Sequence, residues 1–208
     1  NTTFLYSPTS GIQGLVDAFL KDKPLRFSIN EEVLSIDLAN KIVTTDARTI
    51  TYETLINTLP LDIFAKLTNN TELKLKSVDV TVYNITFDSK SSAGDVFSWM
   101  YFPGNVPFYR VGFYNYMSGK KDTSMYVEVS TKTGSKKRPP TMKEMIASLM
   151  KAGVVYGGAP VKDKQMLTIS PAYVIFEKGT DEQVSKYRES LKMNGVHLTG
   201  RYGKWSYQ

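Results

Sequence analysis

The residues best suited to bind a ligand lie between Trp99 and Arg110, where five aromatic side chains surround one arginine. The planar guanidinium of arginine binds a phosphate or a carboxylate through two parallel hydrogen bonds, and nearby rings can stack on a base or a sugar. A turn of Pro, Gly and Asn divides the stretch into two predicted strands. On the second strand, Phe108 and Arg110 should share one face and Tyr109 the other. The pattern fits either an anion-binding site or an aromatic sheet core with a surface arginine.

A second arginine stands among aromatic residues in the segment Gly200–Tyr207. Two glycines there permit a close approach of the backbone, and Arg201 has Tyr202, Trp205 and Tyr207 nearby in the chain. Taken alone, this pattern fits a structural turn as well as a binding site. Two arginine and tyrosine clusters in one short chain point to a ligand with a diphosphate, provided that the fold brings the clusters together.

The residues that the chain lacks exclude several kinds of chemistry. Cysteine is absent and His197 is the only histidine, which excludes disulfides, thiolate metal sites, cysteine nucleophiles and a histidine-rich metal site. Neither a glycine-rich dinucleotide-binding turn nor a P-loop is present, and carboxylates such as Asp79 and Glu128 are scattered. We therefore assign no catalytic residue and no metal, and expect any difficult chemistry to come from a bound cofactor.

Length and charge limit the class of protein. The chain has 208 residues, 41% of them hydrophobic, and a net charge of +6, which suits one globular domain or two small ones. No apolar run approaches the ~20 residues of a membrane span, and the N-terminal residues lack the features of a signal peptide. The lysine-rich clusters at 120–121 and 136–138 lie in expected loops. We therefore expect a cytoplasmic protein without a membrane span, with a small-molecule substrate and no nucleic-acid partner.

Periodicity and capping patterns predict the elements that must position these residues. Ser10, Thr141 and Thr180 each precede a Gln or Glu by three positions and an apolar stripe of helical spacing, which predicts three helices with capping boxes. Segments that alternate in polarity predict strands. The predicted strands are residues 25–29, 33–38, 41–45, 49–52, 55–59, 78–87, 96–102, 108–116, 125–130 and 166–176.

The change from short to long strands near residues 66–74 divides the chain. We predict an α+β fold with a small αβ segment at 1–66, an antiparallel sheet with flanking helices at 67–199, and a separate tail at 200–208. The chain starts without Met, and aromatic residues stand close to its last residue. These features favour a fragment of a longer protein.

Four stretches in the first third resemble, in order and spacing, the middle of flavin-dependent amine oxidases and protoporphyrinogen oxidase-like proteins. They are residues 6–15, 29–37, 41–43 and 50–61. The resemblance implies FAD as the cofactor. It also implies that the backbone of Val33 lies beside the adenine and that Thr58, Leu59 and Pro60 lie near the cofactor.

The later motifs resemble the eukaryotic-type UDP-galactopyranose mutase branch of that superfamily. They are residues 99–111, 115–116 and 200–207. The resemblance implies that Tyr101, Arg110, Arg201 and Tyr207 contact the diphosphate of a nucleotide sugar, and Trp99 belongs to the same motif as Tyr101. Tyr173 matches the tyrosine of a further mutase motif, but its flanking residues differ and are closer to those of protoporphyrinogen oxidase-like proteins.

The resemblance also assigns the segments. Residues 1–66 would be part of an FAD-binding domain, 67–199 a substrate-binding domain, and 200–208 the return into the FAD-binding domain. The family's glycine-rich unit and its Met-Asp segment are missing from the sequence, so we expect the chain alone to hold FAD poorly and to be inactive.

Three functions stay open at this point. The parent protein would act on a nucleotide sugar as a mutase, or oxidise an amine or a porphyrinogen, or the chain would be a binding module without catalysis. The substrate and the oligomeric state are not fixed by the sequence.

Overall fold

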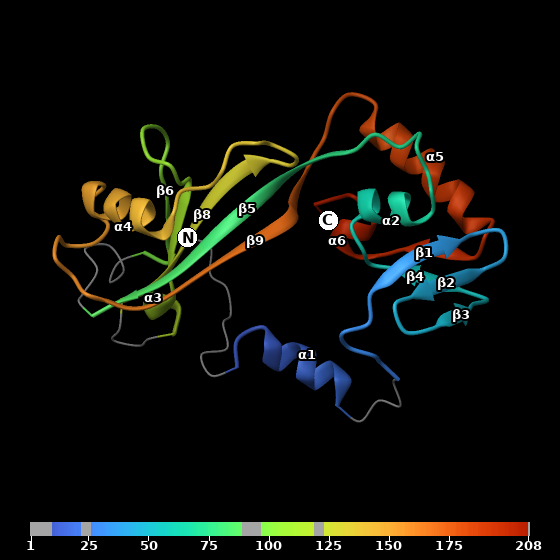
Figure 1. Ribbon diagram of the computed structural model, residues 1–208, viewed down its shortest axis with the longest axis horizontal. Coiled ribbons are helices and arrows are strands. Elements are labelled where there is room, and N and C mark those ends of the chain that lie inside the picture. Colours follow the sequence, from blue (N-terminus) through green and yellow to red (C-terminus); the bar gives the residue numbers. More distant parts are fainter. Residues whose placement is uncertain (1–9, 22–25, 89–96, 119–122, 208) are drawn as a thin grey trace. The chain divides into compact units, whose positions relative to one another are not determined.

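The structure is a computed structural model, and it describes residues 10–21, 26–88, 97–118 and 123–207 (Figure 1). In chain order, the elements of the described residues are α1 (Gln13–Leu20), β1 (Val33–Asp37), β2 (Ile42–Thr45), β3 (Thr49–Thr51), β4 (Leu55–Asn57), α2 (Leu61–Leu67), β5 (Lys76–Phe87), β6 (Trp99–Tyr101), β7 (Arg110–Phe113), α3 (Tyr114–Ser118), β8 (Thr123–Lys132), α4 (Met142–Lys151), β9 (Val161–Ile175), α5 (Thr180–Lys192), β10 (Val196–Leu198) and α6 (Gly200–Gly203). The fold is α+β with antiparallel sheets and several helices, as predicted.

The contacts divide the chain into two compact units. One unit consists of Asn1–Leu25 and Asp79–Ser170, and the other of Arg26–Val78 and Pro171–Gln208. These boundaries differ from those at residues 66 and 199 that the sequence predicts. The difference arises because the end of β9, α5 and β10 pack with the first third of the chain rather than with the residues that precede them.

The first unit is built on a sheet with the strand order β6-β7-β8-β5-β9. Side chains alternate between the two faces of a strand, so Tyr83, Ile85 and Phe87 of β5 all enter the core. Helix α4 packs on this core through Met145 and Leu149, which lie four positions apart on one helix face.

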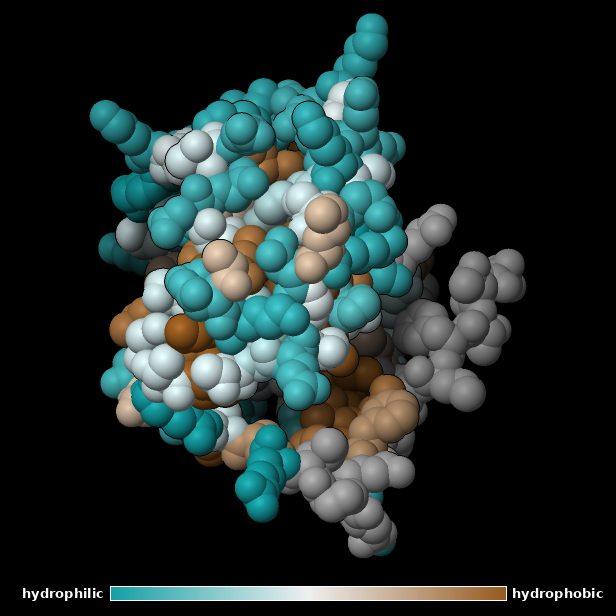
Figure 2. Space-filling view, turned by 90° about the vertical axis from the view of Figure 1, so that its right-hand side faces the viewer, coloured by the Kyte–Doolittle hydropathy of each residue, from teal (hydrophilic) through white to brown (hydrophobic). Residues whose placement is uncertain are grey.

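The second unit contains two smaller sheets. Strands β1, β2 and β3 form an antiparallel meander, and β4 pairs with β10 in parallel, with Leu55 opposite Val196. Leu61 and Phe64 of α2 and Leu191 of α5 are fully buried in the core of this unit. Figure 2 shows that hydrophilic side chains cover much of the face turned to the viewer and that hydrophobic ones form smaller patches.

Of the three predicted capping boxes, only the one at Thr141 is present in the form expected. The hydroxyl of Thr141 accepts from the Glu144 N–H, and Glu144 accepts from the Thr141 N–H. Helix α1 begins at Gln13 without a side-chain cap. Helix α5 begins after Gly179, whose φ of 87° supplies the turn, and the Thr180 hydroxyl accepts from the Glu177 N–H instead.

Some strand predictions are wrong. Residues 26–29 form no strand, and residues 114–116 form helix α3 because β7 ends at Phe113. The first residues of the segment Gly200–Tyr207, whose pattern fits a turn or a binding site, form the short helix α6. Residue 25, residue 96, the cluster at 120–121 and part of the stretch 6–15 lie outside the described residues.

No helix in the described ranges is both long and apolar enough to cross a membrane. A search of the same ranges for three or more neighbouring His, Asp or Glu side chains that could hold a metal ion finds none.

Candidate functional site

The carboxyl ends of the parallel strands β4 and β10 form the edge of the second unit that is best suited to bind a ligand. The chain leaves β4 through Thr58, Leu59 and Pro60, and leaves β10 into α6, which carries Arg201. Parallel strands present their carboxyl ends at the same edge, and open α/β sheets bind ligands there. The structure therefore brings three of the predicted cofactor residues, Thr58, Leu59 and Pro60, to the same edge as Arg201.

Asn57 fixes the shape of this edge. Its side-chain amide donates to the Leu59 carbonyl and accepts from the Leu59 N–H, both at 3.2 Å, which holds the turn after β4. Its backbone carbonyl accepts from the Thr199 N–H at 2.9 Å and so joins this turn to the one after β10. A Cβ on Gly203 would lie 2.7 Å from the same carbonyl, so this position requires glycine.

Arg201 lies among three tyrosine rings. Its guanidinium carbon is 4.7 Å from the ring centre of Tyr207, 5.1 Å from that of Tyr173 and 6.0 Å from that of Tyr202. Rings at these distances attract a cation through their electron-rich faces. The predicted substrate residues Arg201, Tyr173 and Tyr207 therefore form one cluster within the second unit.

The end of β9 holds two of these rings in place. The Tyr207 hydroxyl donates to the Val174 carbonyl at 2.8 Å, and the Tyr202 hydroxyl donates to the Ala172 carbonyl at 2.9 Å. Ala172 and Val174 are buried, and Tyr173 between them faces the other side of the strand, as alternation requires. The cluster is thus preorganised by backbone hydrogen bonds.

Two of the polar atoms of the Arg201 side chain have no hydrogen-bond partner. Its Nε and Nη2 atoms are buried and make no hydrogen bond, and no carboxylate in the described part of the chain forms an ion pair with it. A buried donor without an acceptor costs free energy, more so when the group is charged. Arg201 is therefore poised to receive an anion.

Val33 lies in the same unit as this edge. It is the first residue of β1 and stands opposite Thr45 in the register of β1 and β2. Helix α2, which starts directly after Pro60, packs against β1. The structure gives no closer link between Val33 and the residues after β4.

Arg110, in the first unit, is paired with Glu128. The two residues stand opposite each other on β7 and β8. Arg110 donates from Nη2 to Oε1 at 2.6 Å and from Nε to Oε2 at 3.0 Å, and the Tyr109 hydroxyl also donates to Oε2. The side chains are 23% and 10% exposed, respectively. An external anion at Arg110 would therefore compete with Glu128.

Aromatic rings surround this ion pair. The Arg110 guanidinium carbon lies 5.8–6.0 Å from the ring centres of Tyr101, Tyr109 and Tyr126. Tyr101 stands opposite Arg110 on β6. The Tyr126 ring covers Gly112, where a Cβ would lie 2.0 Å from the ring, so glycine makes room for it.

The predicted facing of the Arg110 strand is wrong. Phe108 is buried in the core, whereas Arg110 and Tyr109 both reach Glu128. Strand β7 begins only at Arg110, so alternation does not extend to the two residues before it.

Each arginine cluster is complete within its own unit. Tyr101 belongs to the Arg110 cluster, with Trp99 two positions before it on β6, and Tyr173 and Tyr207 belong to the Arg201 cluster. That both clusters bind one diphosphate stays a prediction.

Sequence reasoning missed Glu128 and Tyr126. Their separation by two positions on a predicted strand places them on one face, but only the register shows what they oppose.

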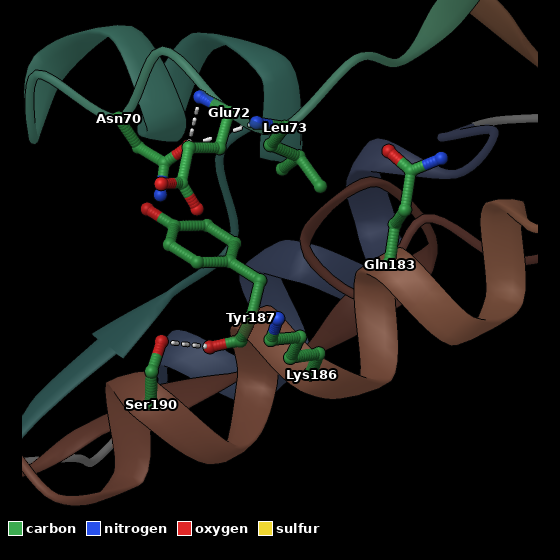
Figure 3. A pocket seen from close by; sticks show the side chains of 7 residues that line it. All are labelled: Asn70, Glu72, Leu73, Gln183, Lys186, Tyr187 and Ser190. Atoms are coloured by element: carbon green, nitrogen blue, oxygen red, sulfur yellow. Dashed lines mark hydrogen bonds between the residues drawn. The ribbon is translucent and has the colours of Figure 1, made fainter.

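A pocket of about 340 Å³ lies between α5 and the segment that follows α2 (Figure 3). Its polar groups are largely satisfied by the protein: Asn70 accepts from the N–H groups of Glu72 and Leu73, and the Tyr187 hydroxyl bonds to that of Thr68 at 2.8 Å. Burial raises the pKa of Tyr187, and the bond to Thr68 partly offsets this. The hydrogen bonds within the protein therefore give no indication that this pocket binds a ligand.

Comparison with known proteins places the fold. No protein-family model matches the chain. Its fold is that of a class of solved structures that includes oxidases, mutases and isomerases. One of them is a reduced UDP-galactopyranose mutase, with 21% identity and a TM-score of 0.85 over 97% of this chain and 47% of that chain.

Two other structures are similar in the same region. A putative protoporphyrinogen oxidase from Exiguobacterium sp. 255-15 has 12% identity and a TM-score of 0.71 over 92% of this chain and 46% of that one. A CLA-producing fatty acid isomerase from P. acnes has 12% identity and a TM-score of 0.65 over 91% and 47%. The chain thus spans about half the length of these proteins. The resemblance to the amine oxidase-like flavoproteins is confirmed at the level of the fold.

Proposed function

We propose that this chain is the substrate-recognition part of an FAD-dependent, oxidoreductase-like enzyme that acts on a nucleotide sugar. The observation that carries the proposal is Arg201, a half-buried cation with unpartnered Nε and Nη2 atoms, among tyrosine rings at the carboxyl edge of β4 and β10. The likeness of the fold to a UDP-galactopyranose mutase supports the choice of substrate.

Arg201 would bind the diphosphate. The Nε and Nη2 atoms of one guanidinium point the same way and can donate two parallel hydrogen bonds to phosphate oxygens. Tyr173 and Tyr207 lie against the guanidinium, and its Nε and Nη2 atoms are buried, where the lower local dielectric strengthens the attraction to an anion. The cluster would therefore give both affinity and orientation.

The turn after β4 would contact part of the FAD cofactor. Thr58 and Leu59 are exposed, so the backbone of this turn is open to a ligand, and Asn57 keeps it in shape. These residues fit part of an FAD site and supply neither a glycine-rich turn nor a charged group for its pyrophosphate. When bound, the flavin would supply the reactive group, and the residues of this chain would bind and orient the substrate.

Titration of the purified chain with UDP by calorimetry tests the role of Arg201. We expect Arg201→Gln to raise the Kd for UDP by about 10-fold or more, because a hydrogen bond to a charged group contributes ~1.5–3 kcal/mol. Arg201→Lys should recover only part of the loss, since lysine lacks the planar fork. Arg48→Gln is the matched control, because Arg48 is an exposed arginine of the same unit that already pairs with Glu31. Equal Kd values for the Arg201→Gln and Arg48→Gln variants would contradict the proposal.

An oxidase of an amine or a porphyrinogen is the second candidate. Its support is the likeness to the putative protoporphyrinogen oxidase and the changed residues around Tyr173. Oxygen-dependent turnover of such a substrate by the full-length protein, without affinity for UDP, would favour this function. A visible spectrum of the full-length protein separates both enzymes from a binding module, because a full-length protein that binds UDP without FAD would act by recognition alone.

A further inference from the structure

A second pocket on α5 differs from the one in Figure 3. It lies between α5 and the segment from Lys204 to Tyr207, within the second unit, and has a volume of about 700 Å³. Neither Arg201 nor any residue of the turn after β4 lines it. Tyr207 forms a shared wall, because its ring also lies against Arg201.

Two residues that line this pocket each carry a buried donor without an acceptor. Trp205 is 2% exposed, yet its indole Nε1 makes no hydrogen bond, and the Nε of Arg188 is likewise buried without a partner. An indole N–H and a guanidinium can only donate, so neither can be satisfied by another donor. Buried polar groups in folded proteins nearly always have a partner, which makes two such donors in one pocket a sign of a ligand.

The charges of the pocket favour an anion. Arg188 and Lys204 both line it, and in the ranges described neither forms an ion pair. Asp181 is the carboxylate among the described lining residues, so the cations outnumber it. The ligand group that matches two positive charges and an indole donor is an oxyanion.

The other side chains that line the pocket favour a ligand whose remaining part, beyond the oxyanion, is apolar. The rings of Phe176 and Tyr207 pack edge to face, with centres 5.4 Å apart, and Val184 lies in the same pocket. Apolar walls with a few convergent polar groups are typical of small-molecule sites.

We propose that the pocket between α5 and residues 204–207 binds a small organic anion, a carboxylate or a phosphate ester with an aromatic or apolar body. Arg188, Lys204 and the Trp205 indole hold the oxyanion, and Phe176, Val184 and Tyr207 hold the body. The site shares Tyr207 with the Arg201 cluster, but the groups that hold its oxyanion are not used by the nucleotide-sugar site proposed above, so the inference does not rest on that function.

Nuclear magnetic resonance of the ¹⁵N-labelled chain tests this site directly. The chain has two tryptophans and so two indole N–H signals, and Trp205→Phe identifies the signal of Trp205. Phenyl phosphate and benzoate are the probes, and neutral benzyl alcohol is the control. We expect at least one anion to move the Trp205 signal in a saturable way and benzyl alcohol to leave it in place. The stronger binder shows whether the oxyanion is a phosphate or a carboxylate.

Variants then separate a built site from general charge attraction. Arg188→Gln should weaken binding of the better probe by about 10-fold, because it removes a charged donor. Arg48→Gln, which removes the same charge elsewhere in the unit, should change the affinity little. A Trp205 signal that does not respond to either anion, or equal losses in the Arg188→Gln and Arg48→Gln variants, would overturn the proposal.

Discussion

At the scale of single residues, Arg110 and Arg201 differ in what neutralises them. Glu128 binds the fork of Arg110 through two hydrogen bonds, whereas the described surroundings of Arg201 are tyrosine rings and backbone. A guanidinium paired with a carboxylate stabilises the fold and carries little net charge. A guanidinium that contacts only rings has no carboxylate to neutralise its charge, so it can still attract an anionic ligand.

This difference predicts that Arg110→Gln acts mainly on stability. The substitution leaves the largely buried Glu128 with the Tyr109 hydroxyl but without its cation, which should lower the free energy of unfolding by about 1–3 kcal/mol. Urea unfolding measures the loss. The same change at Arg138, which pairs with Glu144 at an exposed site of the same unit, should cost less.

A double variant tests whether the pair is the cause. If Arg110 stabilises the protein through Glu128, then Arg110→Gln in a Glu128→Gln background should cost clearly less than it does alone. Equal costs in the two backgrounds would mean that Arg110 acts through the rings around it.

At the scale of elements, helix α4 depends on its cap. The pKa of Glu144 is lowered from 4.5 to about 2, first by the hydrogen bonds from the Arg138 fork and then by those from the Thr141 N–H and hydroxyl. The folded-state pKa is the lower one, so the charge of Glu144 contributes stability above pH 4.5. That contribution is lost as the pH falls from 4.5 toward 2.

Glu144→Gln should therefore make the free energy of unfolding depend less on pH below about pH 6. Glutamine can still accept from the Thr141 N–H, so the substitution removes the charge and keeps the cap. We expect the wild type to lose more unfolding free energy than the variant between about pH 6 and about pH 3, as measured by urea unfolding. Asp163→Asn, at an exposed position of β9, is the control and should keep the wild-type profile. An unchanged profile in Glu144→Gln would show that this carboxylate does not couple to folding.

Local patterns account for the elements that the sequence predicts well. The alternation of Tyr83, Ile85 and Phe87 identifies β5, and Thr141 and Glu144 identify the start of α4, because strand alternation and the capping box involve neighbours in the chain. The pairing of β4 with β10 joins distant segments, and no local pattern indicates it. The predicted domain boundaries differ from the compact units for this reason.

The same distinction applies to the candidate site. Arg110 and Arg201 stand out by their aromatic neighbours in the chain, whereas Tyr173 was found through a family resemblance. Glu128 looks like a scattered carboxylate in the sequence, because its partner depends on the register of β7 and β8. Arg188 follows a core residue of α5 and gives no signal until its surroundings are seen.

At the scale of the whole molecule, the described residues form two hydrophobic cores. Leu149 of α4 is fully buried in the core of the first unit, and Leu191 of α5 is fully buried in the core of the second. Strands β5 and β9 each contribute residues to both units. Separate cores predict that each unit can lose stability without an equal loss in the other.

Matched core variants measure this independence. Leu149→Ala and Leu191→Ala each remove a buried leucine side chain, and each should cost about 2–5 kcal/mol, because the cavity adds to the lost burial. Amide hydrogen exchange should show the loss of protection concentrated in residues 79–170 for Leu149→Ala, and in residues 26–78 and 171–207 for Leu191→Ala. If either variant instead lowered protection equally in both units, the two cores would unfold as one.

The same question can be asked with a ligand. If the two cores unfold as one, a ligand bound at Arg201 should protect the amides around Arg110 as strongly as those of its own unit, whereas independent cores confine that protection to the second unit.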